Sequence, residues 1–230
     1  MEENRKQSVR IQKSVLNAGE KKLLVWLASR MPSWVTSDML TYTGMVGAFI
    51  IAVGYALSGL NINWLWLASF GFVVNWFGDS LDGTIARVRN TQRPVYGFFL
   101  DHNVDVVNEV LMFAGAGLSP LMRFDVALGV LVAYLMLSVY VYINAHLKNE
   151  FRLSYAGLGP TEFRIIVIIV NTLYIFIPAL RNLSFSVCSV SFSVLDFIAM
   201  VITVIILAMY ALTFISDRKY YSRLDPPKRD

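Results

Sequence analysis

Long apolar runs occupy most of this 230-residue chain and limit what it can fold into. Hydrophobic residues make up 56% of the sequence and charged residues only 16%, whereas a soluble domain carries roughly a quarter charged residues. Runs of this length are typical of helices that cross a bilayer. The runs cover residues 40–58, 63–82, 99–118, 124–146, 164–180 and 193–215. The sequence therefore predicts an all-α integral membrane protein, a helical bundle with six transmembrane helices.

The basic residues predict the orientation of this bundle. With both termini in the cytoplasm, 18 of the 20 Lys and Arg residues fall on the cytoplasmic side, and only Arg123 and Arg181 fall opposite. The positive-inside rule favours this arrangement. We expect a cytoplasmic N-terminal segment (1–38), a six-span membrane domain (39–216) and a basic cytoplasmic tail (217–230). In a bacterium the membrane would be the plasma (inner) membrane.

The N-terminal segment carries a further predicted helix between Glu20 and Trp34. Apolar Leu23, Leu24, Trp26, Leu27 and Met31 alternate there with Lys21, Lys22 and Arg30. This pattern is typical of an interfacial amphipathic helix lying on the membrane, and a helix packed against the spans is the alternative. The first 22 residues are polar, unlike a cleavable signal peptide. The net charge of +4 follows from topology, so no nucleic acid is expected as a partner.

Four aspartates stand where the second run ends and the third begins. Asp79 and Asp82 are three residues apart, and Asp101 and Asp105 are four apart, so each pair shares one face of a helix. Ionisable groups at membrane depth are costly and usually functional. Four carboxylates repel one another unless cations neutralise them, and their oxygens suit Mg²⁺ or Mn²⁺. The sequence predicts a metal site, with two ions, near the cytoplasmic face.

Displacement at a phosphoryl group is the chemistry that such a site favours. Two ions can stabilise the attacking and the leaving oxygen of an in-line displacement, and a carboxylate can accept the proton of an attacking hydroxyl. Arg87 shares the face of the first pair and suits a phosphate oxygen. A single aspartate at a span end is more simply explained by water or by an arginine partner. Topology alone explains Arg89 and Arg93.

At these residues the chain resembles the CDP-alcohol phosphotransferases (CDP-alcohol phosphatidyltransferases). That family carries D-x-x-D-G-x-x-A-R, a spacer of eight or nine residues, and G-x-x-x-D-x-x-x-D. This chain reads Asp79-Ser-Leu-Asp82-Gly83-Thr-Ile-Ala86-Arg87, nine residues, and Gly97-Phe-Phe-Leu-Asp101-His-Asn-Val-Asp105. All eight fixed positions match, over 27 residues. The motif is long and therefore specific.

The resemblance implies an enzyme of phospholipid biosynthesis. Its binuclear metal site would be formed by Asp79, Asp82, Asp101 and Asp105, and Asp105 would be the catalytic general base. Gly83, Ala86, Arg87 and Gly97 would border the cytidine diphosphate. An acceptor hydroxyl would attack the phosphorus that carries the donor alcohol, and CMP would leave. Homodimers with six spans and an N-terminal interfacial helix are also implied.

A weaker similarity precedes the first span. The family often shows P-x-x-x-T-P-N-x-L-T, a segment that contributes to nucleotide binding, and this chain has Pro32-Ser-Trp-Val-Thr36-Ser37-Asp38-Met-Leu40-Thr41. Asp38 stands where the family has asparagine, and a carboxylate accepts hydrogen bonds but cannot donate them as an amide does. Either Asp38 contributes to the nucleotide site, or Ser37 or Asp38 simply caps the first span.

Two combinations of donor and acceptor would suit such a site. CDP-diacylglycerol can donate a phosphatidyl group to a small polar alcohol, and an anionic acceptor would then need the cations Lys148, Arg152 and Arg164. Alternatively, CDP-choline, CDP-ethanolamine or CDP-inositol can donate a headgroup to a lipid alcohol. Gly159-Pro160-Thr161-Glu162 resembles a segment of the aminoalcohol phosphotransferases, although Glu162 also suits the first turn of a helix, where the dipole favours an anion. We favour phosphatidyl transfer.

A cation-binding transporter is the remaining alternative, because acidic residues also line transport pathways. The clustering of the acids at one face of the bilayer and the absence of a visible inverted repeat argue against it.

Overall fold

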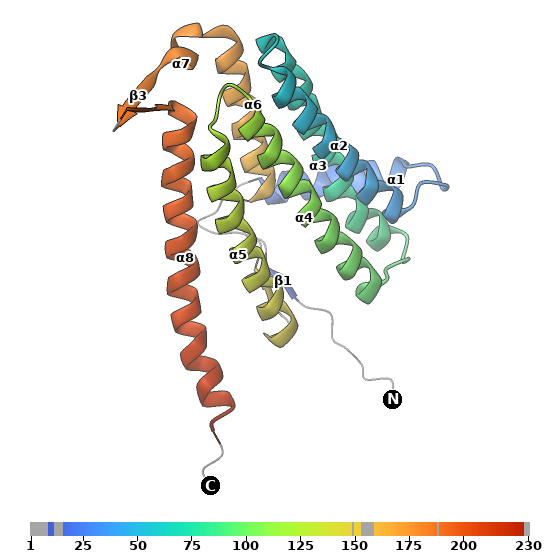
Figure 1. Ribbon diagram of the computed structural model, residues 1–230. Coiled ribbons are helices and arrows are strands. Elements are labelled where there is room, and N and C mark those ends of the chain that lie inside the picture. The colour runs from blue at the N-terminus through green and yellow to red at the C-terminus, as the bar shows by residue number, and fades with distance from the viewer. Residues whose placement is uncertain (1–8, 12–15, 149, 153–158, 188, 228–230) are drawn as a thin grey trace.

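A computed structural model describes residues 9–11, 16–148, 150–152, 159–187 and 189–227, and within them the chain is mostly helical. Its long helices pack side by side as a bundle (Figure 1). The helices are α1 (Asn17–Arg30), α2 (Ser37–Leu57), the 3₁₀ turn η1 (Ile62–Trp64), α3 (Leu65–Val88), α4 (Pro94–Leu118), α5 (Phe124–Lys148), α6 (Pro160–Phe176), α7 (Pro178–Asn182) and α8 (Val194–Leu224). The prediction of a helical bundle is confirmed.

Two small sheets accompany the helices. Strand β1 (Val9–Ile11) pairs in parallel with β2 (Glu150–Arg152), so that Val9 lies opposite Glu150. Strands β3 (Ser184–Val187) and β4 (Val190–Ser193) form an antiparallel hairpin that leads directly into α8. The first sheet joins the segment before α1 to the α5–α6 connection, and the second lies in the α7–α8 connection, so neither interrupts a long helix.

Each of the six predicted spans corresponds to one long helix, namely α2 to α6 and α8. Three of them are long and apolar enough to cross a membrane: α2 over Ser37–Leu57, α5 over Phe124–Leu147 and α8 over Val194–Leu224. Helices α3 and α4 carry the acidic residues, which lower their hydropathy, and α6 has only 17 residues. Apolar helices together with exposed apolar side chains indicate an integral membrane protein, and the six-span arrangement stays a prediction.

Several helices extend beyond the predicted membrane spans. Helix α3 continues to Val88 instead of ending at 82, and α4 begins at Pro94 instead of 99. Helix α8 continues to Leu224, well into the predicted tail. The reason is physical: polar residues end an apolar run without ending a helix, because most of them sustain helical backbone. The aspartates consequently lie within helices.

Glycines allow α2 to approach α3 and α4 closely. A Cβ atom on Gly78 of α3 would lie 2.2 Å from the backbone nitrogen of Gly44, and one on Gly47 would lie 2.4 Å from that of Asn75. On the α4 side, a Cβ on Gly115 would lie 2.4 Å from the Cα of Ala52. Small residues at such positions permit backbone-to-backbone packing between membrane helices. This packing holds α3 and α4 on a common partner.

Helix α1 runs crosswise to the long helices (Figure 1). It buries Leu24 and Ala28 in a cluster that includes Leu81 and Ile85 of α3. On its other side Trp26 is 52% exposed. The alternative of a helix packed against the spans is therefore confirmed, and a membrane contact through its outward apolar residues stays a prediction.

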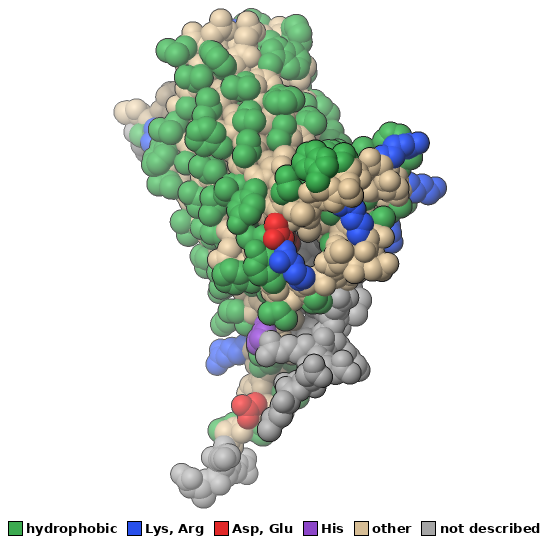
Figure 2. Space-filling model, turned by 90° about the vertical axis from the view of Figure 1, so that its right-hand side faces the viewer, with side chains coloured by type: hydrophobic (Ala, Val, Ile, Leu, Met, Phe, Trp, Pro, Cys, Tyr) green, Lys and Arg blue, Asp and Glu red, His purple; other side chains and the backbone are tan. Residues whose placement is uncertain are grey.

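Apolar side chains cover much of the outer surface. On the face shown in Figure 2, hydrophobic side chains cover the upper body of the bundle and charged ones are few. Along α8, Phe197, Val204 and Leu212 are between 58% and 71% exposed. An apolar patch this extensive indicates contact with a membrane or with another protein.

Candidate active site

Three of the four predicted aspartates come together between α3 and α4. Oxygen atoms of Asp79, Asp101 and Asp105 all lie within 4.8 Å of one another, and the three side chains are partly buried. The spacing of four residues places Asp101 and Asp105 on one face of α4, and the close packing of both helices on α2 brings Asp79 opposite them. The predicted cluster is thus largely assembled by the fold.

Asp82 is held by α2 beside this cluster. Its Oδ2 atom accepts a hydrogen bond of 2.6 Å from the Thr41 hydroxyl, and its Oδ1 atom accepts one from the backbone N–H of Gly83. The Ser37 hydroxyl donates to the Asp82 carbonyl oxygen at 3.0 Å. The side chain is buried, and these contacts fix its orientation.

Arg164 of α6 joins the cluster from a third helix. Its Nη2 atom lies 2.5 Å from Asp79 Oδ2, and its Nε atom donates to Asn75 Oδ1 at 3.0 Å. Asn75 in turn donates to the carbonyl oxygen of Gly44 at 2.9 Å. A continuous set of polar contacts therefore links α2, α3 and α6. Of the three cations considered for an anionic acceptor, Arg164 reaches the acids, and the side chains of Lys148 and Arg152 lie outside the described residues.

Glu162 occupies the first turn of α6. Its Oε2 atom accepts from the backbone N–H of Gly159 at 3.0 Å, and its Oε1 atom accepts from that of Leu16 at 2.9 Å. The side chain is buried, and these bonds cap the helix and attach the chain that leads into α1. The interpretation as a first-turn residue of the helix is confirmed.

The residues expected to border a nucleotide lie on two helices. Arg87 is exposed and donates to the Thr84 hydroxyl at 3.0 Å. A Cβ atom on Gly83 would lie 3.3 Å from the Arg87 guanidinium, whereas one on Gly97 would meet nothing within 4 Å. Gly83 therefore leaves room for Arg87, and Gly97 faces open space. Ala86 is buried in the helix packing.

The residue that caps α2 differs from the two that the sequence suggested. Thr36 caps the helix, because its hydroxyl accepts from the backbone N–H of Met39 at 3.2 Å. The prediction of Ser37 or Asp38 as the cap is wrong, since Thr36 is the last residue with extended backbone. Asp38 forms an ion pair with Arg93, whose guanidinium also lies 4.1 Å from the centre of the Tyr96 ring.

The Asp38–Arg93 pair fastens the α3–α4 connection to the start of α2. The hydrogen bond to Asp38 raises the pKa of the Arg93 guanidinium above its usual value. Arg93 is therefore more than a topological signal, contrary to the prediction from the sequence.

Arg89 has a structural role that the sequence did not reveal. Its guanidinium donates to four backbone carbonyl oxygens of the α1–α2 connection, those of Met31, Pro32, Ser33 and Val35, at distances of 2.5 to 3.5 Å. These acceptors lie more than fifty positions earlier in the chain. No local pattern signals such a contact, because the fold alone brings the two connections together.

Two polar residues near the acids, Asn75 and Glu109, were also missed. Asn75 precedes Asp79 by four positions and therefore lies on the same face of α3, so its position in an apolar run was a usable signal. Glu109 follows Asp105 by four positions and continues the acidic face of α4. Buried oxygens of Asn108 and Glu109 have no hydrogen-bond partner among the described residues. Polar side chains therefore continue along α3 and α4 on one side of the aspartates.

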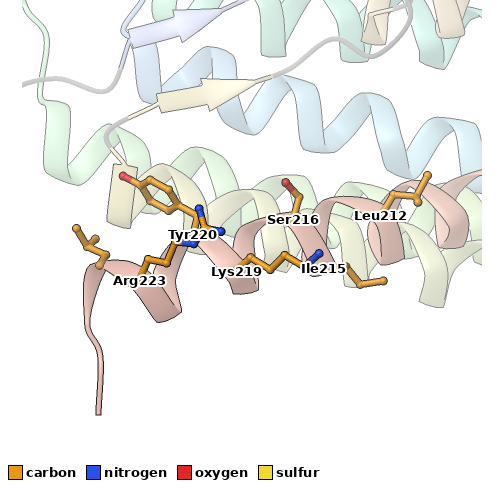
Figure 3. A pocket seen from close by; sticks show the side chains of 7 residues that line it. Leu212, Ile215, Ser216, Lys219, Tyr220 and Arg223 are labelled. Carbon is orange, nitrogen blue, oxygen red and sulfur yellow. The ribbon is translucent and has the colours of Figure 1, made fainter. Parts of the chain in front are cut away.

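A cavity of about 670 Å³ lies elsewhere, against the cytoplasmic end that we predict for α8 (Figure 3). Leu212, Lys219 and Arg223 are among its lining residues, and all of its lining residues come from α8. None of the four aspartates contributes to it, so the cavity and the acidic cluster are separate features.

A family model for CDP-alcohol phosphatidyltransferases matches residues 34–212 of this chain. The match covers all five helices from α2 to α6, both motifs and most of α8. The chain belongs to the CDP-alcohol phosphatidyltransferase family. Membership agrees with the geometry, because the acids of the family pattern are those that converge between α3 and α4.

Two curated relatives are similar to parts of this chain. A phosphatidylinositol phosphate synthase from Cutibacterium acnes is 35% identical over 86 residues, which are 36% of this chain and 38% of that protein. An archaetidylinositol phosphate synthase from Pyrococcus horikoshii is 28% identical over 140 residues, which are 61% of this chain and 70% of that protein. The first match therefore spans well under two thirds of its relative.

The acidic cluster fits a divalent metal, on which this family generally depends. Its ligands would all be carboxylate oxygens, the type that hard cations such as Mg²⁺ and Mn²⁺ prefer. Three such groups within 4.8 Å of one another also carry a mutual repulsion that a cation relieves. The arrangement can therefore bind a metal ion at the place where the family motif predicts one.

Proposed function

We propose that this chain is an enzyme of phospholipid biosynthesis that transfers a phosphatidyl-type group from a lipid-linked CDP-alcohol to a small phosphorylated alcohol. The observation that carries the proposal is the convergence of Asp79, Asp101 and Asp105 with Arg164 joined to Asp79. Both relatives are named as synthases of inositol phosphate lipids. We therefore favour CDP-diacylglycerol as the donor and an inositol phosphate as the acceptor.

The reaction requires one bond to form and one to break at phosphorus. The acceptor oxygen bonds to the phosphorus that carries the donor alcohol, the bond from this phosphorus to the oxygen of CMP breaks, and CMP leaves. Asp105, partly buried in α4, accepts the proton of the attacking hydroxyl as the general base. Asp79, Asp82, Asp101 and Asp105 would hold two Mg²⁺ or Mn²⁺ ions, which stabilise the attacking and leaving oxygens when bound.

The chain's own side chains would orient the two substrates. Arg164 offers a planar guanidinium beside the acids, a geometry suited to the phosphate of an anionic acceptor. Arg87 lies exposed near Gly83, where it can reach a phosphate of the nucleotide. Gly97 leaves open space for the cytidine. Ala86 of α3 and Asp38 of α2 would border the same region. Lys148 and Arg152 would add charge at the acceptor side.

Headgroup transfer from CDP-choline or CDP-ethanolamine is less well supported. The proposal for a cationic headgroup depended on Glu162, and both of its oxygens accept backbone N–H groups at 2.9 and 3.0 Å. Occupied in this way, Glu162 is poorly disposed to bind a substrate. Membership of a transferase family likewise disfavours a cation transporter.

Topology and assembly complete the proposal. We infer six spans with both termini and the acids at the cytoplasmic face, because the basic residues gather there. The three-part division into 1–38, 39–216 and 217–230 follows from this topology. We also infer a homodimer, as the family resemblance implies.

The decisive experiment is a CMP-release assay with purified protein and Mg²⁺. It crosses CDP-diacylglycerol, CDP-choline, CDP-ethanolamine and CDP-inositol with inositol phosphate, glycerol phosphate, serine and a lipid alcohol. We expect CMP only from CDP-diacylglycerol, fastest with a phosphorylated alcohol. Turnover of CDP-choline with a lipid alcohol would support headgroup transfer instead. Cation uptake into liposomes, with no CMP released from any pair of donor and acceptor, would refute the proposal that the protein is an enzyme.

A further inference from the structure

Glu20 of α1 accepts hydrogen bonds from two helices of the site. Its Oε1 atom lies 2.6 Å from the Thr161 hydroxyl of α6, 2.8 Å from the indole nitrogen of Trp76 and 3.5 Å from the Ser80 hydroxyl of α3. A carboxylate oxygen that accepts from several donors holds them more strongly than a neutral acceptor would. One atom of the N-terminal helix therefore ties α3 to α6.

The donors lie next to the residues that join the two helices at the site. Trp76 and Ser80 flank Asp79 in α3, and Thr161 lies one turn before Arg164 in α6. The contact between Arg164 and Asp79 is 2.5 Å. The Glu20 tie is thus about one helical turn from the contact between Arg164 and the acidic cluster.

Few other polar contacts hold α6 against α3 among the described residues. Deep in the bundle, Asn171 donates to the Ser69 hydroxyl at 3.2 Å, and at the site Arg164 bonds Asn75 and Asp79. In the first turn of α6, the Thr161 hydroxyl donates to Glu20, and Glu162 accepts from the backbone N–H of Leu16 before α1. Loss of the Glu20 contact would loosen this first turn on α3 and, with it, the position of Arg164 one turn later.

We propose that Glu20 is a positioning residue that sets where Arg164 stands relative to the acidic cluster, and thereby sets the affinity for the anionic acceptor. This inference rests on the proposed function for its kinetic test. It assigns a role in acceptor binding to the N-terminal helix α1, which contributes no residue to the acidic cluster. Glu20 itself contacts neither substrate nor metal and acts through Thr161 and Trp76.

The test compares Glu20→Ala and Glu20→Gln with the control Ser29→Ala. Glutamine keeps an acceptor oxygen at the same distance but loses the charge, and alanine loses both. Ser29 lies on the same helix, and its hydroxyl bonds only within α1 as far as the described contacts go, to Val25 at 2.8 Å. The measurement is steady-state CMP release as a function of acceptor concentration.

We expect Glu20→Ala to raise the acceptor KM about tenfold, the factor that corresponds to about 1.4 kcal/mol. The donor KM and kcat should change less than about twofold, because Asp105 and the nucleotide residues keep their places. Glu20→Gln should restore most of the acceptor affinity, and Ser29→Ala should match the wild type.

Two results would overturn the proposal. A fall in kcat and thermal stability with an unchanged acceptor KM would show that Glu20 only supports folding. An equal rise of the acceptor KM in Ser29→Ala would show that any change in α1 has this effect and that the contacts of Glu20 do not position Arg164.

A second readout separates this inference from the proposed function. If the wild type releases no CMP, the proposed function fails, and amide hydrogen exchange still tests the tie. Glu20→Ala should speed exchange in the first two turns of α6 about tenfold relative to the wild type and to Glu20→Gln, because local opening costs less. Equal exchange in all three proteins would refute the positioning role.

Discussion

The packed helices α2, α3 and α4 differ sharply from the pair formed by α5 and α8. In the first group, glycine contacts bring backbones together and polar residues face inward, as Asn75 and Asp82 do at 1% and 7% exposure. In the second, apolar side chains face outward and the polar contacts, such as Tyr221 with Asn144 at 2.9 Å, lie toward one end. Polar residues within close backbone packing therefore distinguish the helices that build the site from α5 and α8.

The largest effect should come from an acid of the packed group compared with an acid of the pair. Asp105→Asn removes the proposed general base, so kcat for CMP release should fall about 10²- to 10⁴-fold. Asp217→Asn on α8, where the carboxylate accepts from Tyr140 at 2.5 Å, should change kcat less than about twofold. Near wild-type release by the first variant would exclude Asp105 as the base.

Glycine substitutions test whether the packing itself differs. Gly78→Ala places a methyl group where backbone atoms of α2 lie within 2.5 Å, and we expect a loss of about 1–3 kcal/mol or more in the free energy of unfolding. Gly129→Ala on α5 meets nothing within 4 Å and should be neutral or stabilising. The measurement is thermal unfolding in detergent, and equal midpoints for the two variants would refute the contrast.

Arg89→Ala should have an intermediate effect. It removes donors to four carbonyl oxygens of the α1–α2 connection, which should lower the free energy of unfolding by about 1.5–3 kcal/mol. Limited proteolysis should then cut near residues 31–35 faster than it does in the wild type. The control Arg223→Ala on α8 should leave the cleavage pattern unchanged. The same pattern in both variants would show that Arg89 does not hold the α1–α2 connection in place.

The smallest effect should come from the Asp38–Arg93 pair. Its side chains are 32% and 54% exposed, and water screens an exposed ion pair, so it contributes little to stability. Arg93→Ala should therefore shift the unfolding midpoint slightly at low salt and not at all near 1 M salt, where charges are screened. A larger, salt-independent loss would mean that the cation–ring contact with Tyr96 dominates.

Much of this architecture could be predicted from local patterns. The apolar runs located the six long helices, because burial in lipid demands hydrophobic side chains along a whole span. The spacing of Asp101 and Asp105 placed both on one face, because helical geometry determines which side chains share a direction. Helix ends were less predictable, since polarity ends a run of apolar residues but leaves helical backbone free to continue, as α3 and α8 show.

By itself, the sequence determined the helices, the four acids and the family chemistry, all of which depend on residues close together in the chain. Only the tertiary structure decided that Arg164 meets Asp79, that Thr41 donates to Asp82 and that Arg89 binds the α1–α2 connection. The physical reason is distance along the chain. These partners are separated by 41 to 85 positions, and no helical period relates them, so helix packing alone selects which side chains come together.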